Sequence, residues 1–221
     1  MGDSPALFTT AQQHVYSYVR EQILSGSYVG GTQLDPAKIA SALNVSRMPV
    51  REAFRQLDAE GLIVIRPNRG ATVISLTPFE VEELFEMRAA LEVLALRYAI
   101  PELTADAVSE LEALKERMDR VREDRILWIQ RHNEFHQFLS SLGKRNKLAQ
   151  EINRLRTLVQ PYLLIYIDSY GGPEMDGYDH GELLTAVLSR NVKRAESRMR
   201  EHIRRASVGI IASISSGPHS K

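Results

Sequence analysis

Three arginines at helical spacing are the first residues in this chain whose types and positions suggest chemistry. Arg47, Arg51 and Arg55 recur every fourth residue within VSRMPVREAFRQL, so on an α-helix they lie along one ridge. A guanidinium can donate a bidentate pair of hydrogen bonds to a guanine edge, or bind a phosphate. An isolated ridge of this kind is more often a solvated face, paired here with the nearby acids Glu52, Asp58 and Glu60. The secondary structure predicted around the ridge must therefore distinguish a surface that binds nucleic acid from a solvated face.

Four of the six histidines are expected to face the protein core. His132 and His136 share one helical face with apolar residues, His180 opens a predicted helix, and His202 continues an inward stripe. One inward histidine is usually an ordinary core residue, but four suggest convergence on a divalent ion, with zinc or nickel favoured. The chain contains no cysteine, so any metal must be held by histidine or carboxylate.

Arg88 is the third candidate, because it continues an apolar stripe made by Val81, Leu84, Leu91 and Ala95. A guanidinium that points into a helical bundle needs an anionic partner. Glu92, one turn further along, could supply it, and so could a small carboxylate ligand bound from solution. The sequence leaves both possibilities open.

The elements before residue 77 predict a winged helix-turn-helix. The pattern indicates a helix over 15–23, a second from about Asp35 and a third from the N-cap Ser46, with Pro49 in its first turn. Two β-rich runs, 62–65 and 71–74, flank the turn RPNRG and predict a hairpin. In this arrangement the third helix enters the major groove and the hairpin touches neighbouring backbone or minor groove, which gives the arginine ridge a role.

The remainder of the chain is predicted to be an all-α bundle of about six helices. Thr77 begins a capping box with Glu80, and Thr104 is expected to cap the next helix. Further helices are indicated over 124–142, 146–167, 178–190 and 191–212, with a loop over 168–177 and a kink at Pro161. The chain is therefore predicted to be mainly α, with domains over 1–76 and 77–221.

Composition and charge narrow the class of protein. A content of 43% hydrophobic and 25% charged residues favours a globular chain, and a net charge of zero argues against bulk coating of nucleic acid. No apolar run is long enough to span a bilayer and no signal segment is evident, so we expect a cytoplasmic protein. Positive charge in the first domain is focused on five arginines within 23 positions: Arg47, Arg51, Arg55, Arg66 and Arg69.

The stretch from about Gln12 to Val73 closely resembles the winged helix of the GntR family of bacterial regulators. Its centre reads LDPAKIASALNVSRMPVREAFRQLDAEGLIVIRPNRGATV. Met48 stands where the family usually has threonine. The resemblance implies DNA contacts at seven matching positions: Ser46, Arg47, Pro49, Val50, Arg51, Arg69 and Gly70.

The helical half resembles the FadR-type, or FCD, ligand-binding domain of the same family through EMRAALEVLALRYA, HNEFHQFL and GKRNKL. Many such domains bind a metal through one aspartate and three histidines, and carboxylate effectors dock on the metal and a nearby arginine. His136, His180 and His202 match the three histidine positions, while His132 occupies the place of the aspartate. The resemblance implies a metal and effector site in this domain, with Arg88 as the effector-binding arginine.

These patterns predict a ligand-responsive transcription factor. We expect a homodimeric repressor that binds a palindromic operator in double-stranded DNA, and so associates with the nucleoid, until a small carboxylate metabolite releases it. An activator of the same architecture is an alternative. A metal-dependent hydrolase is a further alternative, disfavoured because Glu134, the acid between the paired histidines, lies on another helical face.

Overall fold

The computed structural model describes residues 10–67, 69–170 and 180–216. The chain divides into two compact units, with the division between Ser75 and Leu76. Among the described helices, none has the combination of length and apolar character that a membrane span requires.

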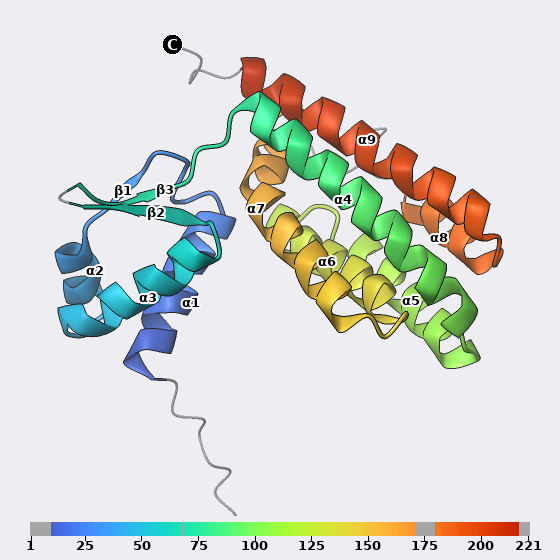
Figure 1. The fold of residues 1–221 in the computed structure, drawn as a ribbon, viewed down its shortest axis with the longest axis horizontal. Helices are drawn as coiled ribbons and strands as arrows, with labels where there is room; N and C mark the ends of the chain where they lie inside the picture. The colour runs from blue at the N-terminus through green and yellow to red at the C-terminus, as the bar shows by residue number, and fades with distance from the viewer. Residues whose placement is uncertain (1–9, 68, 171–179, 217–221) are drawn as a thin grey trace, which may run out of the picture. The chain divides into compact units, whose positions relative to one another are not determined.

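The first unit is a winged helix-turn-helix. It contains α1 (Ala11–Leu24), α2 (Pro36–Ala42) and α3 (Arg47–Ala59), followed by a β-hairpin (Figure 1). Asp35 caps α2 by accepting hydrogen bonds from the backbone N–H groups of Ala37 and Lys38. Helix α3 packs against α1 and α2. The core contains Val15, Val19, Val50, Phe54 and Leu57, as the apolar spacing of α1 and α3 predicts.

The wing is a three-stranded antiparallel sheet of order β1-β3-β2. The predicted hairpin is present as β2 (Ile63–Arg66) and β3 (Gly70–Val73), with Arg66 opposite Gly70. Strand β1 (Gln33–Leu34), which pairs with the other edge of β3, was not predicted. Two residues cannot display the alternation of polar and apolar side chains by which a strand is recognised.

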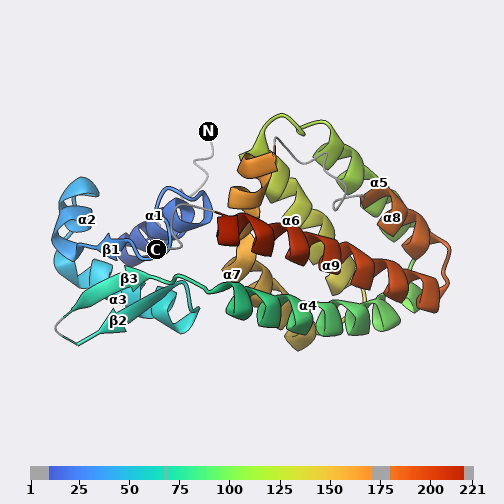
Figure 2. The same cartoon turned by 90° about the horizontal axis from the view of Figure 1, so that it is seen from above.

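The second unit contains six α-helices within the described residues, as predicted. These are α4 (Pro78–Ala99), α5 (Ala105–Asp119), α6 (Arg125–Ser141), α7 (Asn146–Tyr170), α8 (His180–Leu188) and α9 (Val192–Ser216), with a short 3-10 turn, η1 (Ile100–Glu102), after α4. Helices α4 and α9 run side by side (Figures 1 and 2), and α7 packs against both of them. Helix α6 packs against α4 and α7.

Local sequence signals explain where these helices begin. The Thr77 hydroxyl accepts a hydrogen bond from the Glu80 N–H at 3.2 Å, and the Glu80 carboxylate accepts one from the Thr77 N–H at 2.7 Å. This is the predicted capping box, and Thr104 caps α5 as expected. The Asp124 carboxylate caps α6 in the same way.

Two helices end later than their apolar patterns indicated. Helix α7 continues through Pro161 to Tyr170, and α9 continues to Ser216. The predicted beginning of the next-to-last helix at Tyr178, and most of the predicted loop before it, lie outside the described residues. His180 is the first described residue of α8, so the structure describes the side chains of all four candidate metal-binding histidines.

Candidate functional site

Helix α3 presents the arginine ridge because its opposite face is buried. Asn44 adopts a left-handed conformation (φ 52°), which lets the chain turn sharply between α2 and α3. Ser46 is the N-cap residue of α3, but its side chain makes no capping hydrogen bond. Val50, Ala53, Phe54 and Leu57 pack inward, so Arg47, Arg51 and Arg55 are exposed on the other side.

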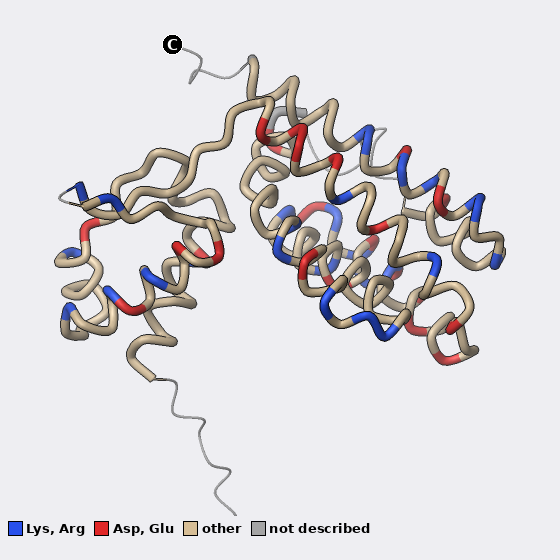
Figure 3. The backbone as a smooth tube through the Cα atoms, viewed as in Figure 1, with Lys and Arg blue, Asp and Glu red and all other residues tan. Residues whose placement is uncertain are grey.

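The ridge is not neutralised by the acids that could have paired with it. The Asp58 carboxylate accepts a hydrogen bond from the Ile65 N–H at 2.9 Å and so joins α3 to the wing. The Glu60 carboxylate accepts one from the Tyr16 hydroxyl at 2.7 Å. In the part of the chain that the structure describes, Arg47, Arg51 and Arg55 form no ion pair. Figure 3 shows the basic positions along α3 and near the tip of the wing.

The other residues proposed to contact DNA differ in accessibility. Arg69 is exposed, and its carbonyl accepts a hydrogen bond from Gln33 Nε2 at 3.0 Å. Gly70 has φ 77°, a conformation that disfavours any residue with a side chain. The backbone conformation at this position therefore favours glycine. Met48 is 63% exposed, whereas Val50 is 0% exposed. Val50 therefore positions the helix with its side chain and has only its backbone available for DNA.

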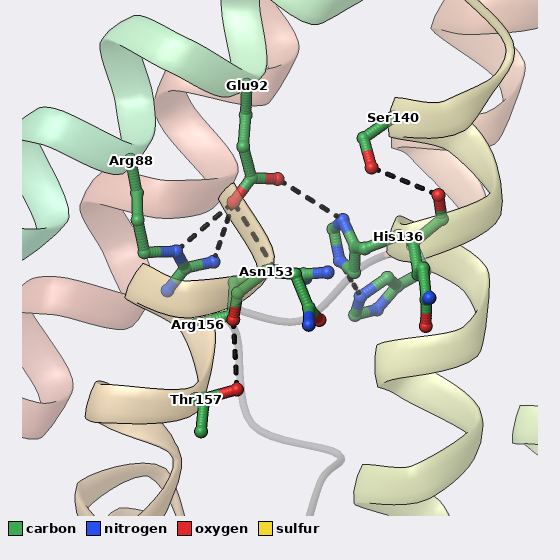
Figure 4. Close-up of polar contacts among 9 residues, drawn as sticks. Arg88, Glu92, His136, Ser140, Asn153, Arg156 and Thr157 are labelled. Carbon is green, nitrogen blue, oxygen red and sulfur yellow. Dashed lines mark hydrogen bonds and ion pairs between the residues drawn. The ribbon is translucent and has the colours of Figure 1, made fainter. Parts of the chain in front are cut away.

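In the second unit, Arg88 pairs with Glu92, the first of the two partners considered for it. Arg88 Nε and Nη2 donate to the same Glu92 oxygen, Oε1, at 3.1 and 3.0 Å (Figure 4). Both side chains are buried. The ion pair places a charged centre inside the bundle.

A second buried arginine, Arg156 on α7, was missed by the sequence analysis. Its Nε lies 3.5 Å from Glu92 Oε1, and neither Nε nor Nη2 has a hydrogen-bond partner. Burial lowers the pKa of Arg156 to about 10, with Glu92 opposing that shift, so the guanidinium is charged at neutral pH. The stripe of Ile152, Leu155 and Val159 around it carries the same signal that identified Arg88.

Glu92 connects the two arginines to the histidines. Burial raises the pKa of this carboxyl, but the charges of Arg156 and Arg88 outweigh burial and leave the pKa below its ordinary value. Glu92 is therefore ionised at neutral pH. Its second oxygen, Oε2, lies 3.6 Å from His136 Nδ1 (Figure 4).

The four predicted histidines meet in the core of the second unit. His132 and His136 come from α6, His180 from α8 and His202 from α9, and all four are buried. Each offers one ring nitrogen, and these nitrogens lie within 4.8 Å of one another. The Nε2 atoms of His136 and His180 are 3.1 Å apart. The cluster is consistent with a metal site.

The buried surroundings keep three of these rings neutral. Burial, reinforced by neighbouring positive groups, lowers the pKa of His132, His136 and His202 well below the ordinary value. A neutral imidazole is the form that binds a metal ion. By contrast, Glu134 forms an ion pair with Arg131 at 2.6 Å, so the acid considered for hydrolysis has a structural partner.

A winged helix with an exposed arginine ridge, combined with a helical unit that holds a buried polar site, defines a one-component regulator of transcription. Comparison with known proteins agrees. Residues 11–73 match the family model described as "Bacterial regulatory proteins, gntR family", and residues 83–205 match the FCD domain model. The chain belongs to the GntR family of transcriptional regulators and carries an FCD domain, and it is not an enzyme.

Individual relatives extend over most of the chain. The HTH-type transcriptional repressor RspR of Escherichia coli is 28% identical, over 90% of this chain and 88% of that protein. The HTH-type transcriptional repressor GlaR of the same organism is also 28% identical, over 85% of this chain and 90% of that protein. The structure of E. coli McbR/YncC superimposes with a TM-score of 0.79 at 21% identity, covering 94% of this chain and 99% of that one, which supports the fold.

Proposed function

We propose that this chain is a homodimeric repressor that leaves a palindromic operator when a small carboxylate metabolite binds the FCD domain. The observation that carries the proposal is the pairing of an exposed, un-neutralised arginine ridge with a buried cationic site. Two relatives over most of the chain, RspR and GlaR, are named repressors, which favours repression over activation. Action on chromosomal DNA would place the protein in the cytoplasm.

The proposed DNA contacts divide by role. Arg47 and Arg51, nearest the start of α3, read base edges in the major groove, and Arg55 binds a phosphate. Ser46, whose hydroxyl is not used for capping, binds phosphate together with N–H groups at the start of α3. The remaining contacts come from the exposed Met48, the backbone around Pro49 and Val50, and the wing residues Arg69 and Gly70.

The proposal of a homodimer rests on the small DNA-contact surface of a single recognition helix. One recognition helix contacts too few base pairs for firm binding, and two-fold symmetry doubles the contacts on an inverted repeat. Selection of bound duplexes from a random pool by the full chain tests this. We expect enrichment of an inverted repeat with half-sites spaced by about one helical turn or a multiple of it. Enrichment of a single, non-repeated site would contradict the dimeric arrangement.

We propose that His132, His136, His180 and His202 hold a divalent ion, with zinc or nickel favoured. The fit rests on the donor set: four histidine ring nitrogens within 4.8 Å of one another, beside the buried carboxylate Glu92. A bound ion would supply a positive charge to which a carboxylate can coordinate. Because an imidazole binds a metal ion in its neutral form, four histidine ligands would leave that charge for an anion to balance.

Metal analysis of protein purified without a histidine tag or chelator tests the metal site. We expect about one ion per chain, lost when His136 and His180 are both replaced by alanine. Replacement of the exposed His14 by alanine is the matched control and should leave the metal content unchanged. A metal content well below one ion per chain in the unaltered protein would contradict the assignment.

Effector binding must alter operator affinity through the equilibrium between two arrangements of the dimer. A carboxylate that binds the releasing arrangement more tightly weakens DNA binding, and DNA weakens carboxylate binding by the same factor. Arg88 and Arg156 are the proposed carboxylate-binding residues. A thermal-shift screen of organic and sugar acids, with and without chelator, tests the effector class. We expect carboxylates to raise the melting temperature, and no response to any acid would contradict it.

A further inference from the structure

The imidazole of His136 lies between the histidine cluster and the buried carboxylate of Glu92. Its Nε2 is 3.1 Å from His180 Nε2, inside the cluster, whereas its Nδ1 is 3.6 Å from Glu92 Oε2 (Figure 4). The side chains of His136 and Glu92 are only 1% and 4% exposed, so water does not separate them from each other. The two nitrogens of this ring therefore face different chemical groups.

His136 Nδ1 is a buried polar atom that has no hydrogen-bond partner among the described residues. Buried polar groups in native proteins are nearly always satisfied, so an exception of this kind needs an explanation. The distance from Nδ1 to Glu92 Oε2 exceeds that of an ordinary N–H···O hydrogen bond, about 2.9 Å, by only about 0.7 Å. A small rotation of the ring or of the carboxylate would close the hydrogen bond.

Two guanidiniums hold the Glu92 carboxylate in the orientation that presents Oε2 to His136. Arg88 donates two hydrogen bonds to the other oxygen, Oε1, at 3.1 and 3.0 Å, and Arg156 Nε lies 3.5 Å from that same oxygen. Because both arginines approach Oε1, Oε2 stays directed towards the imidazole. An ionised carboxylate has no proton to donate, so it can only accept a hydrogen bond from the ring.

This arrangement determines which nitrogen of His136 can bind a metal ion. A neutral imidazole carries one N–H group, and its other nitrogen has the lone pair that a metal ion needs. With the proton on Nδ1, the ring donates to Glu92 and presents the Nε2 lone pair to the histidine cluster. With the proton on Nε2, the Nδ1 lone pair would face a carboxylate oxygen, which is repulsive. Glu92 thus favours the tautomer that a metal site in the cluster requires.

We infer that Glu92 is a positioning residue for the proposed metal site, because it holds the proton of His136 on Nδ1 and leaves Nε2 to bind the ion. This inference rests on the proposed metal site and adds to it a residue on α4, outside the four histidines. Partners that orient a metal-binding histidine in this way strengthen metal binding, and their replacement usually weakens it about 10–100-fold.

A crystal structure of the unaltered full chain loaded with zinc tests the assignment of the two nitrogens. We expect zinc on His136 Nε2 and a distance from Nδ1 to Glu92 Oε2 of less than about 3.2 Å, which is a hydrogen bond. Zinc on His136 Nδ1, or zinc bound directly by Glu92, would overturn the inference while leaving a metal site in place.

The zinc affinity of two variants measures the contribution of the carboxylate. Competition with a chromophoric chelator gives the dissociation constant, at a temperature where circular dichroism shows every protein to be folded. Glu92→Gln, which keeps the size of the side chain and removes its charge, should weaken zinc binding about 10–100-fold. Glu134→Gln is the matched control on α6, because Glu134 pairs with Arg131, and it should change the affinity by less than about threefold.

The outcomes separate this inference from the proposed function. If the unaltered protein binds well below one zinc ion per chain, the metal site and this inference both fail, while the role in DNA binding stands. If folded Glu92→Gln binds zinc as tightly as the unaltered protein, the role of Glu92 fails and the metal site stands. If Glu92→Gln does not fold, the zinc-loaded structure of the unaltered protein still decides between the two nitrogens.

Discussion

Glu92 accepts two hydrogen bonds from Arg88 with one oxygen, while its other oxygen lies near His136. Side chains from three helices, Arg88 on α4, Arg156 on α7 and His136 on α6, thus lie close to this one carboxylate (Figure 4). The stability of the second unit and the positions of its buried arginines are therefore linked through a single residue.

Replacing Glu92 with glutamine should strongly destabilise the protein. The variant leaves Arg88 and Arg156 buried without a counter-charge, and breaking a buried pair in this way costs about 3–5 kcal/mol. Urea unfolding measures the change in the free energy of unfolding. Glu151→Gln, which removes one partner of the half-exposed pair with Arg154, is the control and should cost less than about 1 kcal/mol. Equal losses in the two variants would contradict this account of Glu92.

At the DNA surface, Arg51 and Arg55 are both exposed, but we expect their replacement to have different effects. Arg51→Ala should weaken binding to the selected operator while changing binding to random duplex little, with a loss of about 1–3 kcal/mol in discrimination. Arg55→Ala should weaken both and reduce the salt dependence of binding. Fluorescence anisotropy with the two duplexes measures these affinities. Equal effects on both duplexes in both variants would contradict the division of roles.

At the scale of elements, the close approach of α7 and α9 depends on a glycine. A Cβ atom at Gly209 would lie 2.6 Å from Tyr166 Cζ, inside the contact distance of carbon atoms. Tyr166 is only 7% exposed, so its ring has little room to move away. We therefore expect the cost of this close contact to exceed the stability that alanine normally adds over glycine inside a helix.

Gly209→Ala should therefore lower the free energy of unfolding by about 1–3 kcal/mol, the usual cost of overpacking a core. The melting temperature of the chelator-treated protein measures it. Val208→Ala, at the adjacent position that is 57% exposed, should change stability by less than about 0.5 kcal/mol. A melting temperature for Gly209→Ala at or above that of the unaltered protein would show that α7 and α9 are packed less tightly than described.

The elements that could be predicted from the sequence are those whose signals are local. The apolar stripe of α3, the capping box at Thr77 and the turn before Gly70 each depend on neighbouring residues, and each is present. Strand β1 could not be predicted, because its two residues are defined only by pairing with β3, far along the chain.

The candidate site was predictable to a similar extent. The inward positions of the four histidines follow from helical spacing, whereas their convergence depends on the packing of α6, α8 and α9. The same spacing also marks Arg156 as inward, but its contact with Glu92 joins α7 to α4 and is visible only in three dimensions.

At the scale of the whole molecule, stability should depend on pH through the buried histidines. His132, His136 and His202 have pKa values well below the ordinary value when the chain is folded, so below a pH of about 6.5 the unfolded chain binds more protons. Stability is thus full above that pH and is lost as the pH falls. In chelator-treated protein, the loss should reach up to about 1.4 kcal/mol per histidine for each pH unit.

Urea unfolding at about pH 7.5 and about pH 5.5 measures this dependence. His132→Asn should make the dependence weaker, while His14→Asn, at an exposed position, should leave it unchanged. A free energy of unfolding that is the same at both pH values would show that the histidines are not buried in neutral form.

One titration tests most directly whether the buried site around Arg88 and Arg156 controls DNA binding by α3. The dissociation constant for the selected operator is measured by fluorescence anisotropy for the unaltered protein and for Arg156→Met. Each measurement is made without ligand and again at saturation with each acid that raises the melting temperature in the thermal-shift screen. We predict that at least one of these acids weakens operator binding by about tenfold in the unaltered protein, and by less than about threefold in the variant. An operator affinity unchanged by every acid that binds the protein would contradict the claim.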